Sequence, residues 1–488
     1  MPPQIVSSTE SPTEIACDAL VVGAFASNGG FALGPGAASV DEALDGYLSE
    51  HLEDASFKAG IGDIASIATM RRLPAKTVVV VGLGGHDEIK PSRLRRAAGA
   101  ATRRLSERSA VATTLHQEGG NEAAAAVAEG FVLASYKYTA LKSEPRPSKI
   151  QRVLLLGADA GAAERGAIAA EATLLARDLI NEPAGSLTPD ALARRAQEIA
   201  DVEGLACEVL EPDEIETRGL GGVLAVGKGS EIPPRFIELG YKPEGAKGRV
   251  ALVGKGVTFD SGGLSLKDMK GMETMKTDMS GAAAVIATMS VLKRLGVSVE
   301  VTAYVPAVEN MPSGKALKPG DVIRHHGGKV SEVLNTDAEG RLILSDALSV
   351  AAESKPDAIV DVATLTGSIM IALGRDVAGL FATDDALADE LTRAADSAGE
   401  PMWRMPLHTD YRRQLDSEVA DFKNIGTRYG GSIVAALFLK EFVPDDIPWA
   451  HLDIAGPARA ESDGDLGPKG GTGIATRTLI AWLLGRGR

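Results

Sequence analysis

Cysteine is nearly absent from this sequence, since only Cys17 and Cys207 occur among its 488 residues. Two cysteines form at most one disulfide, and a chain of this length builds sizeable cores without one, so a reducing compartment is the simpler expectation. The first ten residues contain neither the basic nor the apolar segment that a secretory signal has. We therefore expect a cytoplasmic protein.

Long apolar runs and excess positive charge are also missing. No uncharged apolar stretch reaches the roughly 18 residues that a membrane-spanning helix needs. The formal net charge of −15 argues against a general nucleic-acid-binding surface, although a local basic patch would be compatible with it. Aromatic residues make up only 4% of the chain, so aliphatic side chains must form the cores.

Histidine is absent from the motifs that carry charge in this sequence. No His-Glu-x-x-His or Cys-x-x-Cys pattern occurs, which excludes ordinary zincin and zinc-finger sites, and no Gly-x-Ser-x-Gly elbow marks a serine nucleophile. His325 and His326 lie twelve and eleven residues before Asp337, which belongs to the acidic motif described below. We interpret them as a solvated pair at a strand end, with a role behind the active site as the alternative.

The order of apolar runs and helical patterns predicts an α/β protein of two domains. In residues 1–160, helical patterns alternate with apolar runs suited to buried strands, at Ala19–Phe25, Thr77–Leu83 and Val153–Gly157. The Gly82–Gly85 turn lacks the third glycine of a dinucleotide fingerprint, so we interpret it as a strand-to-helix turn.

An Ala-rich helix is predicted to connect the two domains, because Ala160–Ile180 contains good helix formers and ends before Pro183. We predict an N-terminal α/β domain over 1–160 with a role in assembly or access, a linker helix over 161–183, and a larger catalytic α/β domain over 184–488. The larger domain should have a central mixed sheet flanked by helices. Its predicted strands are Cys207–Leu210, Gly222–Val226, Arg235–Gly240, Arg249–Gly254, Val299–Val305, Ala358–Thr364 and Ala450–Ile454.

The stretch Asn335–Leu342 concentrates charge in an alternating pattern. If its backbone is extended, Asp337, Glu339 and Arg341 leave the chain on the same side and converge. Gly340 between them would let a ligand approach the backbone closely. Taken alone, the stretch is better explained as a polar strand edge or turn that holds a local ion pair.

Further acids and lysines follow the predicted strand Arg249–Gly254. Lys255, Asp260 and Lys267 fall on a glycine-rich loop beyond the carboxyl end of that strand, where open α/β sheets bind ligands. Asp278 is expected near the beginning of an apolar helix. Each has a plain alternative: surface lysines, a turn-forming Asp260 and a helix-capping Asp278.

Considered together, these residues predict a metal site. Four carboxylates in one site repel each other, and the basic residues offset only part of their charge. Oxygen-rich ligation suits Mg²⁺, Mn²⁺ or Zn²⁺, and two ions bridged by shared carboxylates would suit a hydrolytic reaction.

At this point the sequence resembles a known family. Asn335–Leu342 is similar to the signature of the leucyl aminopeptidase (cytosol aminopeptidase) family of di-metal exopeptidases. Further blocks are similar to the family in order and spacing across most of residues 175–485: Gly254–Gly263, Met275–Met279, Asp361–Gly367, Gly431–Ile433 and His451–Gly456. The segments Arg324–Gly328 and Gly456–Arg459 depart from the family pattern, which leaves side-chain preference open.

The resemblance implies a role for each site residue. One ion would be held by Lys255, Asp260, Asp278 and Glu339, and the other by Asp260, Asp337 and Glu339. Lys267 and Arg341 would be the catalytic pair, and a bicarbonate ion at Arg341 would transfer the proton. The residues implied to line the substrate pocket are Met275, Asn335, Thr364, Leu365 and Gly367.

The resemblance also implies the reaction and the assembly. A water activated by two divalent ions, Mn²⁺ or Zn²⁺ with Mg²⁺ as an alternative, would hydrolyse N-terminal amino acids, leucine and other apolar residues among them, from peptides. Intracellular peptide turnover is the implied role, and a homohexamer built as a dimer of trimers is the implied assembly. A second hypothesis is a two-metal hydrolase of another bond, such as a phosphoester. A third is a protein that uses this fold for binding, DNA binding included, and the net negative charge and the intact ligand set argue against binding as the sole role.

Overall fold

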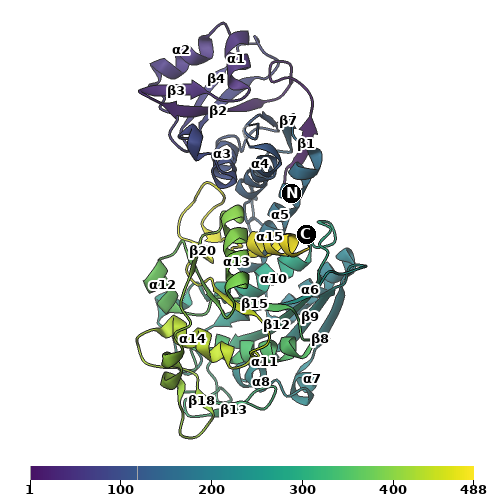
Figure 1. The fold of residues 1–488 in the computed structure, drawn as a ribbon, viewed down its shortest axis with the longest axis vertical. Coiled ribbons are helices and arrows are strands. Elements are labelled where there is room, and N and C mark those ends of the chain that lie inside the picture. The colour runs from purple at the N-terminus through teal and green to yellow at the C-terminus, as the bar shows by residue number, and fades with distance from the viewer. Residues whose placement is uncertain (1, 118, 488) are drawn as a thin grey trace. The chain divides into compact units, whose positions relative to one another are not determined.

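The computed structural model of the protein describes residues 2–117 and 119–487. They form two compact units, residues 1–174 with 460–469, and residues 175–459 with 470–488, so that helix α5 (Ala160–Asn181) contributes to both (Figure 1). The helix predicted over Ala160–Ile180 is therefore confirmed. Within the described part of the chain, each helix is too short or too polar to span a bilayer.

The first unit is built on a mostly parallel sheet. Its strands follow the order β1, β7, β6, β2, β5, β4, with β3 paired to β2, and only β3 and β4 run antiparallel to their neighbours. Their bounds are Gln4–Ser8 (β1), Ala19–Ser27 (β2), Gly30–Leu33 (β3), Ile64–Ala68 (β4), Thr77–Gly82 (β5), Ala110–Thr113 (β6) and Arg152–Leu156 (β7).

Alternate residues of the central strands of this sheet enter two different cores. Val21 of β2 and Val79 of β5 pack with helices α3 (Pro91–Arg104) and α4 (Gly120–Ala134) on one face. Leu20 and Val78 pack on the other face with α1 (Ala37–Ala43) and α2 (Tyr47–Asp54). Strands buried on both faces are expected to read as continuous apolar runs, which explains why β2 and β5 could be predicted.

The second unit is built on a mixed sheet with the strand order β17, β16, β19, β15, β10, β12, β9, β8 and with β11 paired to β12. Strands β10, β12, β15 and β19 are parallel, whereas β8, β9 and β16 pair antiparallel to a neighbour. The bounds are Ala206–Leu210 (β8), Arg235–Tyr241 (β9), Arg249–Gly254 (β10), Gly256–Asp260 (β11), Glu300–Asn310 (β12), Ala358–Ala363 (β15), Ala378–Ala382 (β16), Met402–Arg404 (β17) and Trp449–Asp453 (β19).

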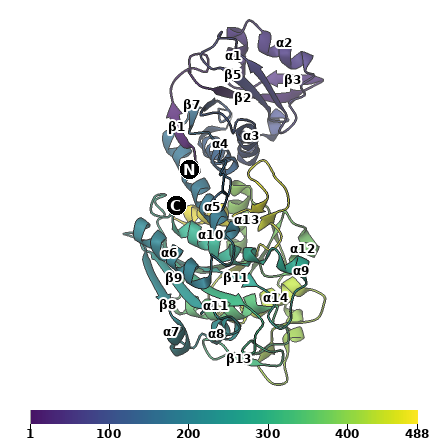
Figure 2. The ribbon, with the colours of Figure 1, turned by 180° about the vertical axis from the view of Figure 1, so that it is seen from behind.

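Helices cover both faces of this sheet, as Figures 1 and 2 show from opposite sides. One core joins the sheet to α8 (Gly221–Gly227), α11 (Glu339–Glu353), α12 (Gly367–Leu373) and α14 (Gly431–Lys440). On the other side, α10 packs on β10 and β15, and α15 packs on α10 and α13. The remaining helices are α6 (Pro189–Glu203), α7 (Pro212–Thr217), α9 (Met269–Met272), α10 (Ser280–Met289), α13 (Asp385–Ala398) and α15 (Thr476–Arg486).

Two small sheets complete the structure. One has the strand order β13 (Val322–Arg324), β14 (Val330–Glu332) and β18 (Phe422–Lys423), and the other pairs β20 (Arg459–Ala460) with β21 (Gly470–Gly471). The Thr188 side chain caps helix α6, since it accepts a hydrogen bond from the Ala191 N–H (3.2 Å) at the beginning of that helix. The predicted fold class is confirmed.

One predicted strand is wrong. Gly222–Val226 lies in helix α8, because its backbone is held by α11 rather than by a sheet. The Asp346 carboxylate accepts a hydrogen bond from the Val223 N–H (2.9 Å), and a Cβ on Gly222 would lie 2.1 Å from the Leu342 carbonyl oxygen. A short apolar run does not by itself distinguish a strand from a buried helix.

Candidate metal centre

Asp260 is placed by a strand rather than by the predicted loop. After β10 ends at Gly254, the chain resumes as β11 and pairs with β12, and Asp260 is the last residue of β11. Gly262 and Gly263 then turn the chain with φ of +85° and +63°, a conformation that residues with a Cβ rarely adopt. The turn brings Lys267 back to Asp260, with 2.7 Å between Nζ and Oδ2.

Lys255 lies between two carboxylates. Its Nζ is 2.7 Å from Asp278 Oδ1 and 2.8 Å from Glu339 Oε1, and it donates a hydrogen bond to the Thr364 carbonyl (3.0 Å). The side chains of the three charged residues are almost completely buried. Asp278 reaches them from a short 3₁₀ helix, Met275–Met279, which precedes α10.

The acidic motif is not extended as the sequence suggested. Helix α11 begins at Glu339, so Glu339 and Arg341 point in directions set by a helix, and Asp337 lies in the turn before it. Asp337 still joins the cluster, since its Oδ1 is 2.5 Å from Lys267 Nζ. Asp337 and Glu339 converge through a turn and the beginning of a helix, whereas Arg341, two residues further along α11, does not converge with them as expected.

Three carboxylates form a set that could hold one ion. Oxygen atoms of Asp260, Asp337 and Glu339 lie within 4.8 Å of one another. These are the three residues that the resemblance assigned to one of the two ions. The other predicted ligands, Lys255 and Asp278, contact Glu339 directly or through each other.

The charges of the cluster favour a divalent cation. Four carboxylates face the two ammonium groups of Lys255 and Lys267, and the buried oxygens Asp278 Oδ2 and Glu339 Oε2 have no hydrogen-bond partner in the described chain. Buried carboxylate oxygens without a donor are costly unless a cation binds them. The donor set, four carboxylates and one amine, therefore fits a divalent metal ion.

The pKa values reflect this crowding. Burial and the nearby Glu339 raise the pKa of Asp260 to about 6. Burial lowers the pKa of Lys255, but Asp278, Glu339 and Asp260 outweigh it and raise the pKa above its ordinary value. A lysine ligand must be neutral, so ions at this site would have to displace its proton.

Arg341 is buried behind the cluster. One guanidinium nitrogen, Nη1, donates to the Asn424 carbonyl (2.7 Å), and Nε has no hydrogen-bond partner among the described residues. Burial lowers the pKa of the guanidinium to about 10, so it stays charged at neutral pH. A buried cation with an unused donor is suited to an anionic ligand.

The predicted pocket residues are all incompletely buried, and two of them, Thr364 and Asn335, contact residues of the cluster. Thr364 donates its hydroxyl proton to Asp278 Oδ1 (2.7 Å), and the Asn335 side chain accepts from the Asp337 N–H (2.9 Å). Met275 begins the 3₁₀ helix that carries Asp278, and Gly367 begins α12.

Three polar residues of the site were missed by the sequence reasoning: Asn310, Asn424 and Asp453. Asp453 is buried and accepts the Leu365 N–H (3.1 Å) and the Thr366 hydroxyl (2.7 Å), so it holds the loop that contacts Lys255. Asn424 binds the backbone of Asn335 and, through its carbonyl, Arg341. Asn310 and Asn424 each stand alone in the sequence, outside the motifs described above, so no spacing pattern could reveal them. Asp453 lies in the block His451–Gly456, but no role was predicted for it.

The interpretation of the histidine pair is wrong for His325. Its side chain is completely buried, its Nε2 is 2.7 Å from Ser331 Oγ, and its ring packs against Phe442. His326 is more open and its Nε2 contacts Glu353 Oε1 at 2.6 Å. The aromatic side chains of α14 and of the segment after it create a core that the sequence pattern did not predict.

Comparison with protein families tests the resemblance seen in the motifs. Residues 174–480 match the cytosol aminopeptidase family, catalytic domain, and residues 21–145 match the N-terminal domain of the same family. The chain belongs to the cytosol aminopeptidase family. The resemblance seen in the motifs is confirmed, and this cytosol aminopeptidase is a metal-dependent hydrolase that acts at peptide N-termini.

Individual relatives span nearly the whole chain. A "Probable cytosol aminopeptidase" of Streptomyces coelicolor is 44% identical and covers 97% of this chain and 96% of its own length. Among solved structures, the bottromycin maturation enzyme BotP in complex with Mn is 41% identical with a TM-score of 0.88, covering 97% of this chain and 100% of its own. A tomato leucine aminopeptidase mutant is 35% identical with a TM-score of 0.88, covering 99% and 97%.

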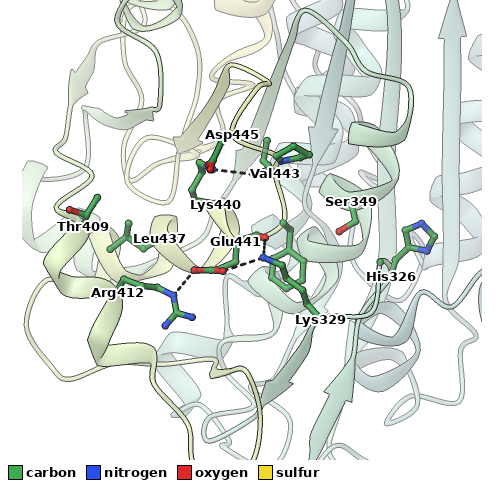
Figure 3. Close-up of a pocket in the computed structure, with 13 residues that line it drawn as sticks. His326, Lys329, Ser349, Thr409, Arg412, Leu437, Lys440, Glu441, Val443 and Asp445 are labelled. Carbon is green, nitrogen blue, oxygen red and sulfur yellow. Dashed lines mark hydrogen bonds and ion pairs between the residues drawn. The ribbon is translucent and has the colours of Figure 1, made fainter.

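A separate cavity of about 710 Å³ lies beside α14 in this cytosol aminopeptidase (Figure 3). Its cationic side chains are already paired: Arg412 with Glu441, Lys329 with Glu441 at 3.2 Å, and Lys440 with Asp445 at 2.6 Å. The residues that line it include none of the metal-centre residues. The paired charges give the cavity no evident role in the reaction.

Proposed function

We propose that this cytosol aminopeptidase binds two divalent ions at the cluster described above. Lys255, Asp260, Asp278 and Glu339 would hold one ion, and Asp260, Asp337 and Glu339 the other. The observation that carries the proposal is that four carboxylates, three of them buried, surround two ammonium groups, with two buried carboxylate oxygens left without a donor among the described residues. Mn²⁺ or Zn²⁺ suits this set of oxygen and nitrogen ligands, and Mg²⁺ is the alternative.

When bound, the ions would supply Lewis-acid activation of water and of the scissile carbonyl. Lys267 is the residue that we assign to the developing oxyanion, because its ammonium group reaches both Asp260 and Asp337 and its side chain remains 18% exposed. Arg341 would hold a bicarbonate ion that transfers the proton. Its buried guanidinium with a free Nε supports anion binding at that place.

The substrates we propose are peptides with a free N-terminal amine, which would bind an ion through the amine. Met275, Asn335, Thr364, Leu365 and Gly367 would line the pocket for the first side chain, and we propose leucine and other apolar residues as the preferred ones. Intracellular peptide turnover in the cytoplasm is the proposed role, carried out by a homohexamer arranged as a dimer of trimers.

Hydrolysis of leucine-p-nitroanilide tests this proposal. We expect release of p-nitroaniline with Mn²⁺ present, loss of activity after thorough chelation, and no hydrolysis of N-acetyl-leucine-p-nitroanilide, which lacks the free amine. Glu339→Ala should lower kcat/KM by at least a hundredfold. Asp445→Asn, which removes a charge from a distant surface pair, is the matched control and should retain activity. Activity that survives chelation, or full activity in Glu339→Ala, would contradict the two-metal mechanism.

A further inference from the structure

Asn310 is a buried residue that connects two strands next to the metal centre. It is the last residue of β12 and pairs with Asp260, the last residue of β11. Its side chain is buried, and its backbone carbonyl accepts hydrogen bonds from the Ser261 N–H (3.0 Å) and the Ser261 hydroxyl (2.7 Å). The end of β12 therefore supports the chain directly after Asp260.

The side-chain amide of Asn310 reaches both halves of the site. Its Nδ2 donates to Asp260 Oδ1 (2.8 Å) and to the Thr336 carbonyl (3.0 Å), one residue before Asp337. Both partners are acceptors, so the NH₂ group and not the amide oxygen must face them. One amide thus links the strand that ends at Asp260 to the turn that carries Asp337.

This contact determines which oxygen of Asp260 is available. Oδ1 accepts two hydrogen bonds at 2.8 Å, one from Asn310 and one from the Gly262 N–H. Oδ2 receives neither of them and faces the cluster, where it lies 2.7 Å from Lys267 Nζ. The carboxylate cannot rotate without breaking both bonds to Oδ1.

A second pair of contacts fixes the same two segments. The Thr336 hydroxyl donates to the Gly262 carbonyl (2.6 Å) and accepts from the Ser265 N–H (2.8 Å). These bonds hold the backbones together through Thr336, whereas the Asn310 amide also contacts Asp260 Oδ1, an oxygen of a proposed metal ligand. The two roles are therefore separable by mutation.

We propose that Asn310 is a positioning residue whose amide sets the orientation of Asp260 and its separation from Asp337, and thereby the affinity of the site for divalent ions. This inference rests on the proposed two-ion function. Residues that orient metal ligands typically change metal affinity 10- to 100-fold when they are removed.

The test compares Mn²⁺ binding, by calorimetry on the full-length metal-free protein, in the parent, Asn310→Ala and Asn310→Asp. Asn310→Asp keeps the shape of the side chain but replaces both N–H donors with an acceptor that repels Asp260. Thr258→Val is the matched control: Thr258 is buried in β11, the strand that ends at Asp260, and its hydroxyl donates to the Val308 carbonyl (3.3 Å).

We expect Mn²⁺ to bind at least tenfold more weakly to both Asn310 variants and within threefold of the parent affinity to Thr258→Val. Folded variants that bind Mn²⁺ like the parent would overturn the role of Asn310 alone, whereas a parent that binds no Mn²⁺ would overturn the proposed function as well. If Asn310→Ala does not fold, Asn310→Asp decides. Unfolding of both variants would also overturn the inference, since it would assign Asn310 to the stability of the whole unit.

Discussion

Gly340 shows at the scale of a single residue how the site depends on close packing. A Cβ at this position would lie 2.5 Å from Lys255 Cε and 2.9 Å from Nζ. Ala normally stabilises a helix by roughly 0.5–1 kcal/mol relative to Gly. Here it would displace the flexible end of Lys255 from Asp278 and Glu339. We therefore predict that Gly340→Ala folds but binds Mn²⁺ at least tenfold more weakly.

Gly485→Ala provides the control for this prediction, because a Cβ there meets no atom within 4 Å in helix α15. It should retain the Mn²⁺ affinity of the parent in the same calorimetric titration. Parent-like Mn²⁺ binding by Gly340→Ala would show that Lys255 is not a ligand. The sequence analysis had given Gly340 a different purpose, access for a ligand to the backbone.

The charged residues of the site could be named from the sequence because they cluster in short motifs. The polar residues that contact them from other strands could not be named. Asn310 contacts Asp260 only because β11 and β12 pair, and Asp453 contacts Leu365 only because β19 lies beside β15. Such contacts depend on strand order, and one sequence without the fold does not reveal strand order.

At the scale of elements, Asp18 connects three strands of the first unit. Its carboxylate accepts the N–H groups of Ser109 and Ala110 (3.0 Å each) beside β6 and pairs with Lys76 Nζ (2.7 Å) before β5. The hydrogen bond from Lys76, followed by those from the two backbone groups, lowers the pKa of Asp18 to about 2. A carboxylate whose pKa is lowered in the folded protein stabilises the fold at pH values above its ordinary pKa. This stabilisation disappears as the pH falls towards 2 and the Asp18 carboxylate takes up a proton.

We predict that Asp18→Asn lowers the free energy of unfolding of the first unit by about 2 kcal/mol at pH 7. The difference from the parent should shrink between pH 4 and pH 2. Urea unfolding followed by circular dichroism measures it, while fluorescence of the three tryptophans, all located in the second unit, reports on that unit separately. Asp45→Asn, which removes an exposed partner of Arg72 at 3.8 Å, should change stability little. A deficit in Asp18→Asn that stays constant with pH would contradict this account.

Elements with clear periodicity were predicted, whereas those defined by tertiary contacts were not. The strands β2, β5, β10 and β15 were predicted close to their observed positions because they are continuous apolar runs. Helix α8 was predicted as a strand because it is a short apolar run. Its helical backbone depends on a tertiary contact, since Asp346 of α11 binds the Val223 N–H near the beginning of α8. The beginning of α11 at Glu339 was missed because its first turn consists of the charged residues of the site.

At the scale of the whole molecule, the proposed hexamer makes a direct prediction. Light scattering of the purified protein should give a mass of six chains, each of 50.6 kDa. The mass should stay the same when Glu339→Gln replaces the parent, because that substitution lies inside a buried site. A monomer at all concentrations would contradict the proposed assembly without contradicting the proposed metal centre, since all of its proposed ligands come from one chain.

The central claim is that one chain holds two divalent ions and that Glu339 contributes to both. Equilibrium dialysis of the metal-free protein against Mn²⁺, followed by elemental analysis, counts the ions that are bound. We predict two Mn²⁺ per chain for the parent and fewer than one for Glu339→Gln at the same free Mn²⁺ concentration. A parent that binds one ion or none, or a Glu339→Gln variant that keeps two, would contradict the claim.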